Sequence, residues 1–573
     1  MAFLFNDPAE FTDELIEGFT AAFGDWVMPV PGGVIRATEY PKGEVAVVIG
    51  GGSGHYPAFA GLVGPGFAHG AAMGNVFASP SAQQVYEVAK AAENGGGVVF
   101  SYGNYAGDVL NFDQAQERLR AEGIPCETVT VTDDIASAGP DQAETRRGIA
   151  GDLFVFKIAA AAAEAGMNLE QVTATAQRAN AVTRTLGVAF SGCTLPGASE
   201  PLFTVPKGMM AVGMGIHGEP GIEEMPIPSA HDLANFLAER VLAERPEGAG
   251  NRVVVLVNGL GSVKSEELFI LYRSVVPALE AAGLEIVGRE VGELATSFEM
   301  AGLSLTLSWV DDELLTLWDA PASTPAYRKG GQVLGQRREA TAIVDDAAHQ
   351  AAEASPESRA QAPNVAQLFA KIEELIDAKA AYLGELDAIA GDGDHGIGMQ
   401  RGAHAAAAAA QKAAEQNLGA GSVIDAAGEA WADRAGGTSG AIWGIFLRTI
   451  AAELGNESAA NINTFSGAVR AGVSAVQKFG KAELGDKTMM DALIPYADEL
   501  ENANQRGEDC AQGLASAAAV AEEKAQATAD LLPRKGRAKT HGEKSRGIAD
   551  PGAVSFSYIA RLVSEYFATE SGD

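Results

Sequence analysis

The pattern of apolar residues changes once along the chain, near Ala326, and this change limits the folds that the 573 residues can adopt. Before it, short β-rich runs at residues 44–49, 97–102, 127–131 and 252–257 alternate with longer amphipathic or alanine-rich stretches. That alternation predicts an α/β domain with a largely parallel sheet. After it, apolar residues recur at three- and four-residue spacing, which predicts an all-α domain built as a helix bundle.

The stretch between these two parts is typical of an inter-domain linker. It is rich in charged residues, Ala and Gln, with two glycines at its start and two prolines toward its end. We therefore predict a multidomain protein, with an α/β domain at residues 1–330, a linker at 331–362 and a helical domain at 363–573. Helices are expected in the last of these at residues 365–385, 400–416, 422–434, 439–454, 463–478, 509–529 and 554–569.

Composition argues against several classes of protein. The formal net charge of −34 makes nucleic acid and anionic membrane poor partners, since both attract basic patches. The three cysteines, Cys126, Cys193 and Cys510, are widely spaced, which argues against a disulfide framework or a zinc site and suits a reducing cytosol. The N-terminal residues do not resemble a signal peptide, and no stretch of about 18 apolar residues predicts a membrane span. We expect a cytoplasmic protein that binds no nucleic acid and no membrane.

Two motifs follow strand-like runs in the first part of the chain. The sequence GGGSGH at residues 50–55 follows the run that ends at Ile49, and its glycines let backbone N–H groups approach a ligand. The same glycines could form only a tight turn, and the ending of a P-loop is missing. Asp108, in NYAGD, follows the run that ends near Tyr102. Its carboxylate suits either general-base chemistry on a hydroxyl or the capping of a helix.

A histidine with glycines close on both sides is His217, in GIHGEPG. Open backbone of this kind predicts an exposed imidazole rather than a core residue, and neutral imidazole is a nucleophile or a base near pH 7. The alternative is a polar surface histidine without a role in chemistry. The residues around His217 do not choose between the two.

Three carboxylates fall within eight residues in DAIAGDGDHG, at Asp387, Asp392 and Asp394. Acids so close together repel one another, and a bound cation relieves that repulsion. Oxygen-only ligands favour Mg²⁺ or Ca²⁺ over zinc, and the twelve-residue loop of an EF-hand is missing. We predict a magnesium site with Asp387 at a helix end and the other two acids on the following loop. A solvated acidic turn is the alternative.

A segment rich in glycine and hydroxyl groups, RAGGTSG at residues 434–440, lies between two expected helices. Backbone amides and hydroxyls at a helix N-terminus form an anion site. Because an acidic metal cluster is expected as well, we favour a phosphate cradle over a plain connection between helices.

Together these segments resemble the dihydroxyacetone kinase family, in its single-chain, ATP-dependent form. The resemblance covers nearly the whole chain. It is carried by GGGSGHYPAFAGLVGPG, NVFASP, GNYAGDVLNF and GIHGEPG in the first domain and by LDAIAGDGDHG, GGTSG, GDKTMMDAL and GRAKTHGEKSRGIADPGA in the second. It implies a ketose-binding α/β domain followed by a helical-barrel nucleotide-binding domain, commonly in a homodimer.

In the first domain the resemblance implies a covalent mode of substrate binding. The family traps the carbonyl carbon of a small ketose as a hemiaminal on the histidine of GIHGEPG, here His217. Asp108 would accept the proton of the terminal hydroxyl, and His55 would hydrogen-bond the bound sugar. Backbone or hydroxyl contacts to the sugar would come from Gly52, Ser53 and Ser79.

In the second domain the resemblance implies ATP held with two Mg²⁺ ions. Asp387, Asp392 and Asp394 would bind the ions, which bridge the phosphates and neutralise charge during phosphoryl transfer. The positions that would contact the nucleotide are His395, Gly437, Thr438, Ser439, Met490, Arg537 and Gly552.

Departures from the family pattern bear on the substrate. Typical members have an acidic residue and a second histidine where this chain has Tyr56 and Phe59, and a substrate-binding lysine where it has Gly103. Asn75 replaces an aspartate, and Ile548 replaces the usual histidine before DPGA. Loss of the lysine predicts free volume beside the sugar hydroxyl, which a four-carbon ketose could fill. We therefore expect erythrulose as the substrate, D-erythrulose ahead of L-erythrulose, with dihydroxyacetone as the alternative.

Two further alternatives come from the same family. One is a ketose-binding regulatory or phosphotransferase-linked protein, as some relatives with separate domains are. The presence of both domains in one chain, without a visible phosphocarrier domain, favours direct use of ATP. The other is a lyase that forms cyclic flavin phosphate.

Overall fold

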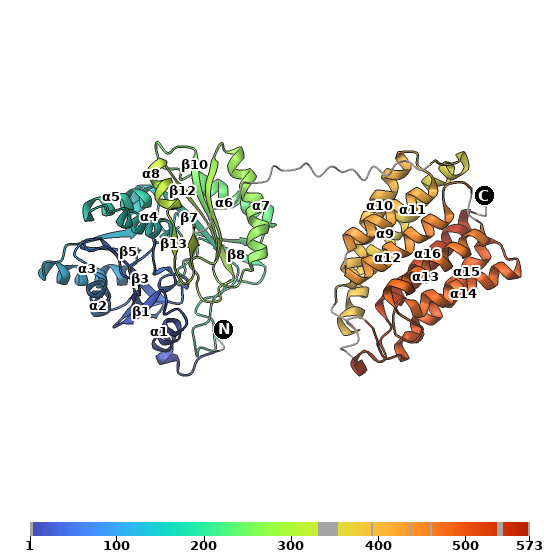
Figure 1. Ribbon diagram of the computed structural model, residues 1–573, viewed down its shortest axis with the longest axis horizontal. Helices are drawn as coiled ribbons and strands as arrows, with labels where there is room; N and C mark the ends of the chain where they lie inside the picture. Colours follow the sequence, from blue (N-terminus) through green and yellow to red (C-terminus); the bar gives the residue numbers. More distant parts are fainter. Residues whose placement is uncertain are drawn as a thin grey trace. The chain divides into compact units, whose positions relative to one another are not determined.

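Two units divide the chain, Met1–Arg337 and Arg338–Asp573. The computed structural model describes residues 4–330, 353–390, 393–435, 437–458, 461–535 and 542–570. In Figure 1 the first unit combines sheets with helices, whereas the second unit is drawn as helices, from yellow to red. The fold is therefore an α/β domain followed by an all-helical domain, as the sequence predicts.

The first sheet orders its strands β1-β2-β4-β3-β5-β6. These are β1 (Val27–Val30), β2 (Gly33–Arg36), β3 (Ala46–Ser53), β4 (Gly70–Val76), β5 (Val98–Gly103) and β6 (Cys126–Val131). Strands β4, β3, β5 and β6 are parallel, and β1 and β2 are antiparallel additions at one edge. Strands β3 and β5 are buried along their whole length, as in parallel sheets covered on both faces.

The second sheet orders its strands β11-β10-β12-β7-β8-β9. These are β7 (Thr183–Ala189), β8 (Met209–Val212), β9 (Glu223–Pro226), β10 (Arg252–Gly259), β11 (Glu285–Gly292) and β12 (Gly302–Trp309). Strands β10 and β11 are parallel and the other neighbours are antiparallel. The prediction of a largely parallel sheet is therefore right for the first sheet and wrong for the second. Loops connect β7 to β8, β8 to β9 and β11 to β12, whereas parallel neighbours need a longer crossover.

Helix α4 (Asp152–Glu164) packs against both sheets. One apolar core joins Phe154 and Ile158 of this helix to Ile49 of β3 and Leu256 of β10. The other helices of this unit are α1 (Phe11–Ala22), α2 (Ala82–Ala92), α3 (Ala106–Ala121), α5 (Leu169–Ala181), α6 (Ala230–Leu242), α7 (Ser265–Ala281) and α8 (Asp312–Asp319). A small two-stranded sheet adds β13 (Ala322–Ser323) and β14 (Arg328–Lys329).

The segment before α4 touches the end of β5. A Cβ built on Gly148 would stand 2.4 Å from the Gly103 Cα, which leaves no room for a side chain. This close approach brings the start of α4 to the carboxyl end of a parallel strand, where α/β proteins bind ligands.

The second unit consists of helices α9 to α16. They are α9 (Pro356–Ala390), α10 (His395–Glu415), α11 (Ala420–Ala435), α12 (Gly437–Leu454), α13 (Ile462–Gly480), α14 (Met490–Arg506), α15 (Cys510–Ala527) and α16 (Pro551–Glu570). Helix α14 is not among the helices expected from the sequence, and it contains Pro495, a residue that usually breaks a helix interior. The helices surround an apolar cavity of about 290 Å³, lined in part by Trp431, Trp443 and Phe556.

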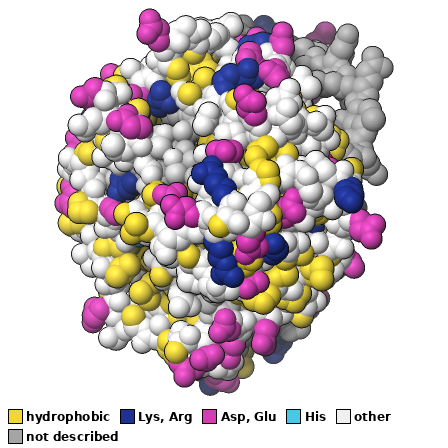
Figure 2. Space-filling view, turned by 90° about the vertical axis from the view of Figure 1, so that its left-hand side faces the viewer, with side chains coloured by type: hydrophobic (Ala, Val, Ile, Leu, Met, Phe, Trp, Pro, Cys, Tyr) yellow, Lys and Arg dark blue, Asp and Glu magenta, His cyan; other side chains and the backbone are white. Residues whose placement is uncertain are grey.

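The surface of the first unit carries mixed charge. Viewed from the left of Figure 1, it shows acidic side chains spread over the face with lysines and arginines between them (Figure 2). Across the described ranges of both units, the structure holds no helix with the length and apolarity that a membrane crossing requires.

Candidate active site

Strained backbone surrounds the predicted ketose site at the ends of β3 and β4. Phe77 and Phe298 both have positive φ, of 53° and 51°. Between them lies Gly54, where a Cβ would stand 2.7 Å from the Phe298 ring and 2.9 Å from the Phe77 ring. The ring of Phe77 stacks on His55, with centroids 5.0 Å apart. Non-glycine residues in this conformation cost energy and occur most often at functional sites.

His55 and His217 face each other in this site, with their Nε2 atoms 3.0 Å apart. The Nδ1 of His55 donates to the Thr296 carbonyl at 2.7 Å, and the Nδ1 of His217 donates to Glu219 Oε1 at 3.1 Å. Because both Nδ1 atoms carry protons in this arrangement, a hydrogen bond between the Nε2 atoms needs one further proton. Burial, together with the charge of His217, lowers the pKa of His55 to about 3, so His55 does not hold a second proton at pH 7.

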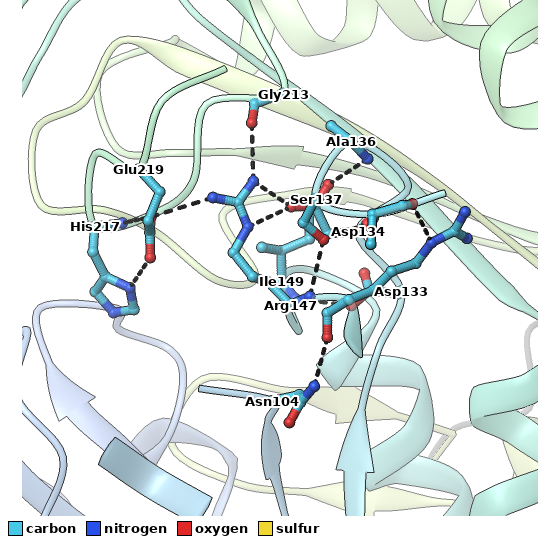
Figure 3. Close-up of polar contacts among 12 residues, drawn as sticks. Asn104, Asp133, Asp134, Ala136, Ser137, Arg147, Ile149, Gly213, His217 and Glu219 are labelled. Carbon is cyan, nitrogen blue, oxygen red and sulfur yellow. Dashed lines mark hydrogen bonds and ion pairs between the residues drawn. The ribbon is translucent and has the colours of Figure 1, made fainter. Parts of the chain in front are cut away.

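A chain of ion pairs holds His217 from its other side (Figure 3). Glu219 Oε2 accepts a hydrogen bond from the His217 backbone and lies 3.8 Å from Arg147 Nη1. Arg147 in turn pairs with Asp134 at 2.8 Å. Burial works against ionisation of Glu219, but the hydrogen bond from His217 and the charges of His217 and Arg147 outweigh it and lower the pKa to about 2. His217 is half-buried rather than fully exposed, because its side chain, held by Glu219, is 23% exposed.

Asp108 lies in the first turn of α3 and is 9% exposed. Burial raises its pKa to about 6, although the Ser79 hydrogen bond and the charge of His217 act in the opposite direction. A carboxylate with this pKa is ionised at neutral pH and is still basic enough to take a proton from a hydroxyl. The structure therefore brings Asp108 and the two histidines into one site.

The remaining predicted sugar contacts already have partners in the protein. The Ser53 hydroxyl donates to the Gly74 carbonyl at 2.7 Å, and the Ser79 hydroxyl donates to the Pro80 carbonyl at 3.1 Å. Gly52 is a close approach, since a Cβ there would stand 2.7 Å from the Ala78 nitrogen. Ser79 borders Asp108 directly, whereas the hydroxyl of Ser53 ties β3 to β4.

The free volume expected at Gly103 is not there. A Cβ on Gly103 would stand 3.1 Å from the Gly148 carbonyl oxygen and 3.1 Å from Tyr105 Cε2. The Tyr105 ring fills this place and also packs edge-on against His217, with centroids 4.7 Å apart. That prediction is wrong because protein interiors are close-packed, so neighbouring groups fill the place of a missing side chain.

In the second unit, the first turns of α10, α12 and α16 meet at His395. Its Nε2 lies 3.0 Å from Ser555 Oγ, and its Nδ1 lies 3.3 Å from Ser439 Oγ. Its backbone N–H donates to Asp387 Oδ2 at 3.2 Å, which ties the end of α9 to the start of α10. Burial lowers the pKa of His395, which keeps the ring neutral at pH 7. Converging helix N-termini carry partial positive charge and favour a phosphate group.

The loop before α14 is fixed by two buried charged side chains. Asp491 accepts hydrogen bonds from two backbone N–H groups of this loop, at 2.5 and 2.7 Å. Lys487 donates from Nζ to the carbonyl oxygens of Ser545 at 2.7 Å and Leu531 at 3.2 Å. This lysine, 2% exposed, therefore joins three segments of the second unit.

The other predicted nucleotide contacts differ in exposure. Gly437 is the first residue of α12, and Thr438, the next, is exposed. Met490 begins α14 and is 2% exposed, so its side chain lies in the core rather than on a surface. Gly552 is in the first turn of α16, and a Cβ there would stand 3.1 Å from Asp550 Oδ2.

Two of the three acids predicted to bind magnesium fall within the described residues. Asp387 lies in the last turn of α9, and Asp394 is the N-cap residue of α10. Carboxylate oxygens from two neighbouring elements are ligands that suit Mg²⁺. Asp392 and Arg537 lie outside the described residues, and those that are described contain no group of three potential metal ligands.

Known proteins match this chain over both units. Residues 17–326 match the Dak1 domain and residues 389–565 match the DAK2 domain. The chain is 54% identical to the L-erythrulose kinase of Pectobacterium atrosepticum, over 98% of this chain and 96% of that protein. The chain belongs to the dihydroxyacetone kinase family. It is also 51% identical to the D-erythrulose kinase of Mycolicibacterium smegmatis, over 99% of this chain and 98% of that protein.

A solved member of the dihydroxyacetone kinase family aligns over nearly the full length. This is the dihydroxyacetone kinase of C. freundii in complex with AMP-PNP and Mg²⁺, with 30% identity and a TM-score of 0.61. The alignment covers 98% of this chain and 99% of that one. Family membership thus agrees with the resemblance that the motifs indicate.

Several residues that support the site of this family member are missing from the sequence prediction. Glu219 and Lys487 lie inside the motifs GIHGEPG and GDKTMMDAL, next to predicted site residues in the sequence. Their position could have indicated a role in the site. Arg147 and Tyr105 carry no comparable signal. Arg147 is far from His217 in sequence, and an aromatic residue after a strand is ordinary core composition.

Proposed function

We propose that this chain is an ATP-dependent kinase that transfers phosphate to a terminal hydroxyl of erythrulose. The relatives named as L- and D-erythrulose kinases are similar to it to about the same degree, which supports the four-carbon ketose. D-erythrulose is the first candidate substrate and L-erythrulose is its competitor. The observation that carries it is the facing pair of His55 and His217 with Asp108 in the same site. Imidazole can add to the carbonyl carbon of a ketose, which a simple alcohol lacks.

In this proposal, binding begins with addition to the carbonyl carbon. The proton between the rings passes from His217 to His55, and the freed lone pair of His217 Nε2 forms a bond to C2 of the ketose. As the carbonyl π bond opens, its oxygen takes the proton from His55. The product is a hemiaminal on a positively charged His217 ring, and the ionised Glu219 stabilises this charge through the Nδ1–H. No group leaves, so the step is reversible.

Phosphoryl transfer follows at a hydroxyl next to Asp108. The carboxylate takes the hydroxyl proton while the hydroxyl oxygen attacks the γ-phosphorus of ATP. The bond between that phosphorus and the bridging oxygen of ADP breaks, and ADP leaves with both electrons. Because its pKa is about 6, Asp108 is ionised at pH 7 before the reaction. After the reaction the protonated carboxyl releases its proton to water.

The nucleotide is assigned to the second unit, at the first turns of α10 and α12. Asp387 and Asp394, together with Asp392, would hold two Mg²⁺ ions, which neutralise phosphate charge when bound. His395 and Ser439 would contact the phosphates. We keep residues 1–330, 331–362 and 363–573 as the proposed domain limits and a homodimer as the proposed assembly.

The proposal is tested by measuring ADP release with D-erythrulose, L-erythrulose and dihydroxyacetone. His217→Ala is expected to lose both ketose binding and transfer. Asp108→Asn is expected to keep ketose binding and to lose transfer by about 10²–10⁴-fold, because a positioned base contributes that factor. Binding is followed without ATP, by ¹³C NMR of a ketose labelled at C2, since addition turns the carbonyl carbon into a tetrahedral one.

Three outcomes would contradict parts of this proposal. Absence of transfer to all three ketoses would reject the kinase activity. Higher kcat/KM for dihydroxyacetone than for both enantiomers of erythrulose would reject the four-carbon substrate. An unchanged tetrahedral ¹³C signal in His217→Ala would place the covalent bond on another residue.

A further inference from the structure

Phe77, the residue after β4, contacts both histidines of the ketose site. Its ring centroid lies 5.0 Å from that of His55 and 5.4 Å from that of His217. The ring is nearly parallel to His55, at 18°, and nearly perpendicular to His217, at 80°. Among the aromatic side chains of the described residues, Phe77 alone has ring contacts with both histidines, and the proposed mechanism gives it no role.

The backbone of Phe77 has a conformation that suits glycine better than phenylalanine. Its φ of 53° is left-handed, and glycine adopts that conformation without the steric cost of a Cβ. The chain is nevertheless fixed there, since the Phe77 N–H donates to the Ser53 carbonyl at 2.9 Å. Strained residues of this kind gather at functional sites, so the ring calls for a reason within the site.

A second strained aromatic residue supports the first. Phe298 has a φ of 51°, and its ring centroid lies 5.6 Å from that of Phe77. Its backbone N–H donates to the Gly54 carbonyl at 2.9 Å, and its ring contacts Phe11 of α1 at 5.9 Å. A row of contacting rings therefore runs from α1 through Phe298 and Phe77 to the two histidines.

These contacts fix the ring of His55, which is 2% exposed. The hydrogen bond from Nδ1 to the Thr296 carbonyl restrains one point of the ring. The stacked contact with Phe77 restrains its plane, because rotation about the Cβ–Cγ bond would turn the imidazole edge into the phenyl ring. The result is a His55 ring at 82° to the His217 ring, with the two Nε2 atoms 3.0 Å apart.

The orientation of both rings matters for addition to a carbonyl. The lone pair of an imidazole nitrogen lies in the plane of its ring, so His217 can attack C2 only along that plane. His55 can donate to the carbonyl oxygen only along its own plane. Misaligned groups react far more slowly and bind less well than aligned ones. Ring orientation in the free protein therefore influences how readily the hemiaminal forms.

We propose that Phe77 is a positioning residue for capture of the ketose. Its ring holds His55 and His217 perpendicular to each other with their Nε2 atoms facing, and this arrangement favours the hemiaminal. Phe77 acts before phosphoryl transfer and has no part in the transfer itself. This inference rests on the proposed function and adds to it the residue that prepares the histidine pair.

The test uses full-length variants assayed with erythrulose and ATP. Phe77→Leu keeps an apolar side chain but has no ring. It is expected to raise KM for erythrulose about tenfold, because two aromatic contacts are lost, and to leave kcat within about twofold. The Kd from the ¹³C binding signal, measured without ATP, should rise by the same factor. Phe77→Tyr keeps the ring and is expected to hold KM within about twofold of the native value.

Phe67→Leu is the matched control. Phe67 is fully buried, contacts the ring of Tyr327 at 5.4 Å and lies before β4, at the opposite end of that strand from Phe77. This variant is expected to lower the temperature of thermal unfolding at least as much as Phe77→Leu, with KM unchanged. A substitution that only reduces the folded fraction lowers the apparent kcat and leaves KM as it was, so the two parameters separate positioning from stability.

A second measurement needs neither ketose nor ATP. Proton NMR of the free protein detects the proton shared by the two Nε2 atoms as a low-field signal. The signal is expected in the native chain and in Phe77→Tyr, and it should be lost in Phe77→Leu. The inference is rejected if Phe77→Leu keeps both the signal and the native KM, if it lowers kcat with KM unchanged, or if Phe77→Tyr raises KM as much as Phe77→Leu does.

Failure of the proposed function has a different signature. If Phe77→Leu loses the signal between the histidines but the native chain transfers no phosphate, Phe77 still positions the pair and the kinase proposal falls. If the native chain and Phe77→Leu phosphorylate erythrulose with equal KM, the kinase proposal stands and the role of Phe77 falls.

Discussion

Around His217, at the scale of single residues, acids are buried in ways that make them reactive. Burial raises the pKa values of Asp108 and Asp134 to about 6, although Arg147 opposes the shift at Asp134. Glu219, held by His217 and Arg147, shifts in the opposite direction and stays ionised. Burial raises the pKa of a carboxyl and a cationic partner lowers it, so neighbouring carboxyls can have different pKa values. One site can therefore contain both a base and a fixed anion.

Asp108→Asn is expected to separate activity from stability. A proton binds more tightly to Asp108 in the native protein than in the unfolded chain. Protonation of Asp108 therefore stabilises the fold fully below a pH of about 4, and this stabilisation is lost as the pH rises through about 6. The asparagine does not ionise and escapes this loss. We compare the free energy of unfolding of the variant with that of the wild type at each pH. Between pH 4 and pH 8 this difference should shift in favour of the variant by up to about 3 kcal/mol.

The measurement is urea unfolding of both proteins at pH 4.5 and pH 8, together with their activity at pH 8. The variant should be inactive and relatively more stable at the higher pH. A stability difference that does not change with pH would show that burial of Asp108 is weaker than the structure indicates.

At the scale of elements, the second unit builds its site from helix starts. Helices α10, α12 and α16 meet through His395 and its two serine partners. Helix α14 joins them through the loop that Lys487 fixes to Leu531 and Ser545. Several N-termini aimed at one region supply positive field without basic side chains, which suits a chain with a net charge of −34.

Lys487→Met is expected to lower both stability and nucleotide affinity. The substitution leaves two buried carbonyl oxygens without a donor, at a cost of about 2–4 kcal/mol in the free energy of unfolding. Loosening of the loop before α14 should raise KM for ATP, while ketose binding in the other unit stays unchanged. Thermal unfolding, KM for ATP and the ¹³C binding signal measure the three effects.

Lys524→Met is the control for this prediction, because that lysine is 45% exposed and pairs with Glu523 on the surface. It should change stability and KM little. Equal effects of the two substitutions would mean that the buried contacts of Lys487 do not hold the loop.

At the scale of the whole molecule, each unit holds half of the chemistry. In the proposed mechanism, the first unit supplies the base and the histidine that binds the carbonyl carbon, and the second unit supplies the acids and helix starts that hold the nucleotide. In this mechanism neither unit transfers phosphate alone. In the proposed homodimer, the helical unit of one subunit can serve the ketose site of the other.

Mixing two inactive full-length variants tests this arrangement. His217→Ala disables the ketose site, and Asp387→Ala disables the nucleotide site. If units from different subunits work together, the mixture should regain a measurable part of the native kcat after subunit exchange, because each mixed dimer contains one intact pair of units. A mixture no more active than its components would show that each chain uses its own two units.

The fold class and the candidate site residues could be predicted from the sequence because their signals are local. The glycine-rich strand end before His55, the acid cluster around Asp387 and the helical periodicity after Ala326 can each be read within short windows. The errors have one physical origin. The antiparallel order of the second sheet, the filled space at Gly103 and the partners of His217 all depend on residues far apart in the sequence.

The sequence by itself determined which groups are candidates for the chemistry of this protein, since its motifs resemble those of the family, and that resemblance implies a carbonyl-binding histidine, a base and a magnesium-binding cluster. Only the tertiary structure decided what each group faces. His55 and His217 are 162 residues apart, yet they meet with 3.0 Å between their Nε2 atoms. The pairing of the two rings and the ionised Glu219 beside Arg147 follow from which strands and helices lie side by side, and no local pattern encodes that order.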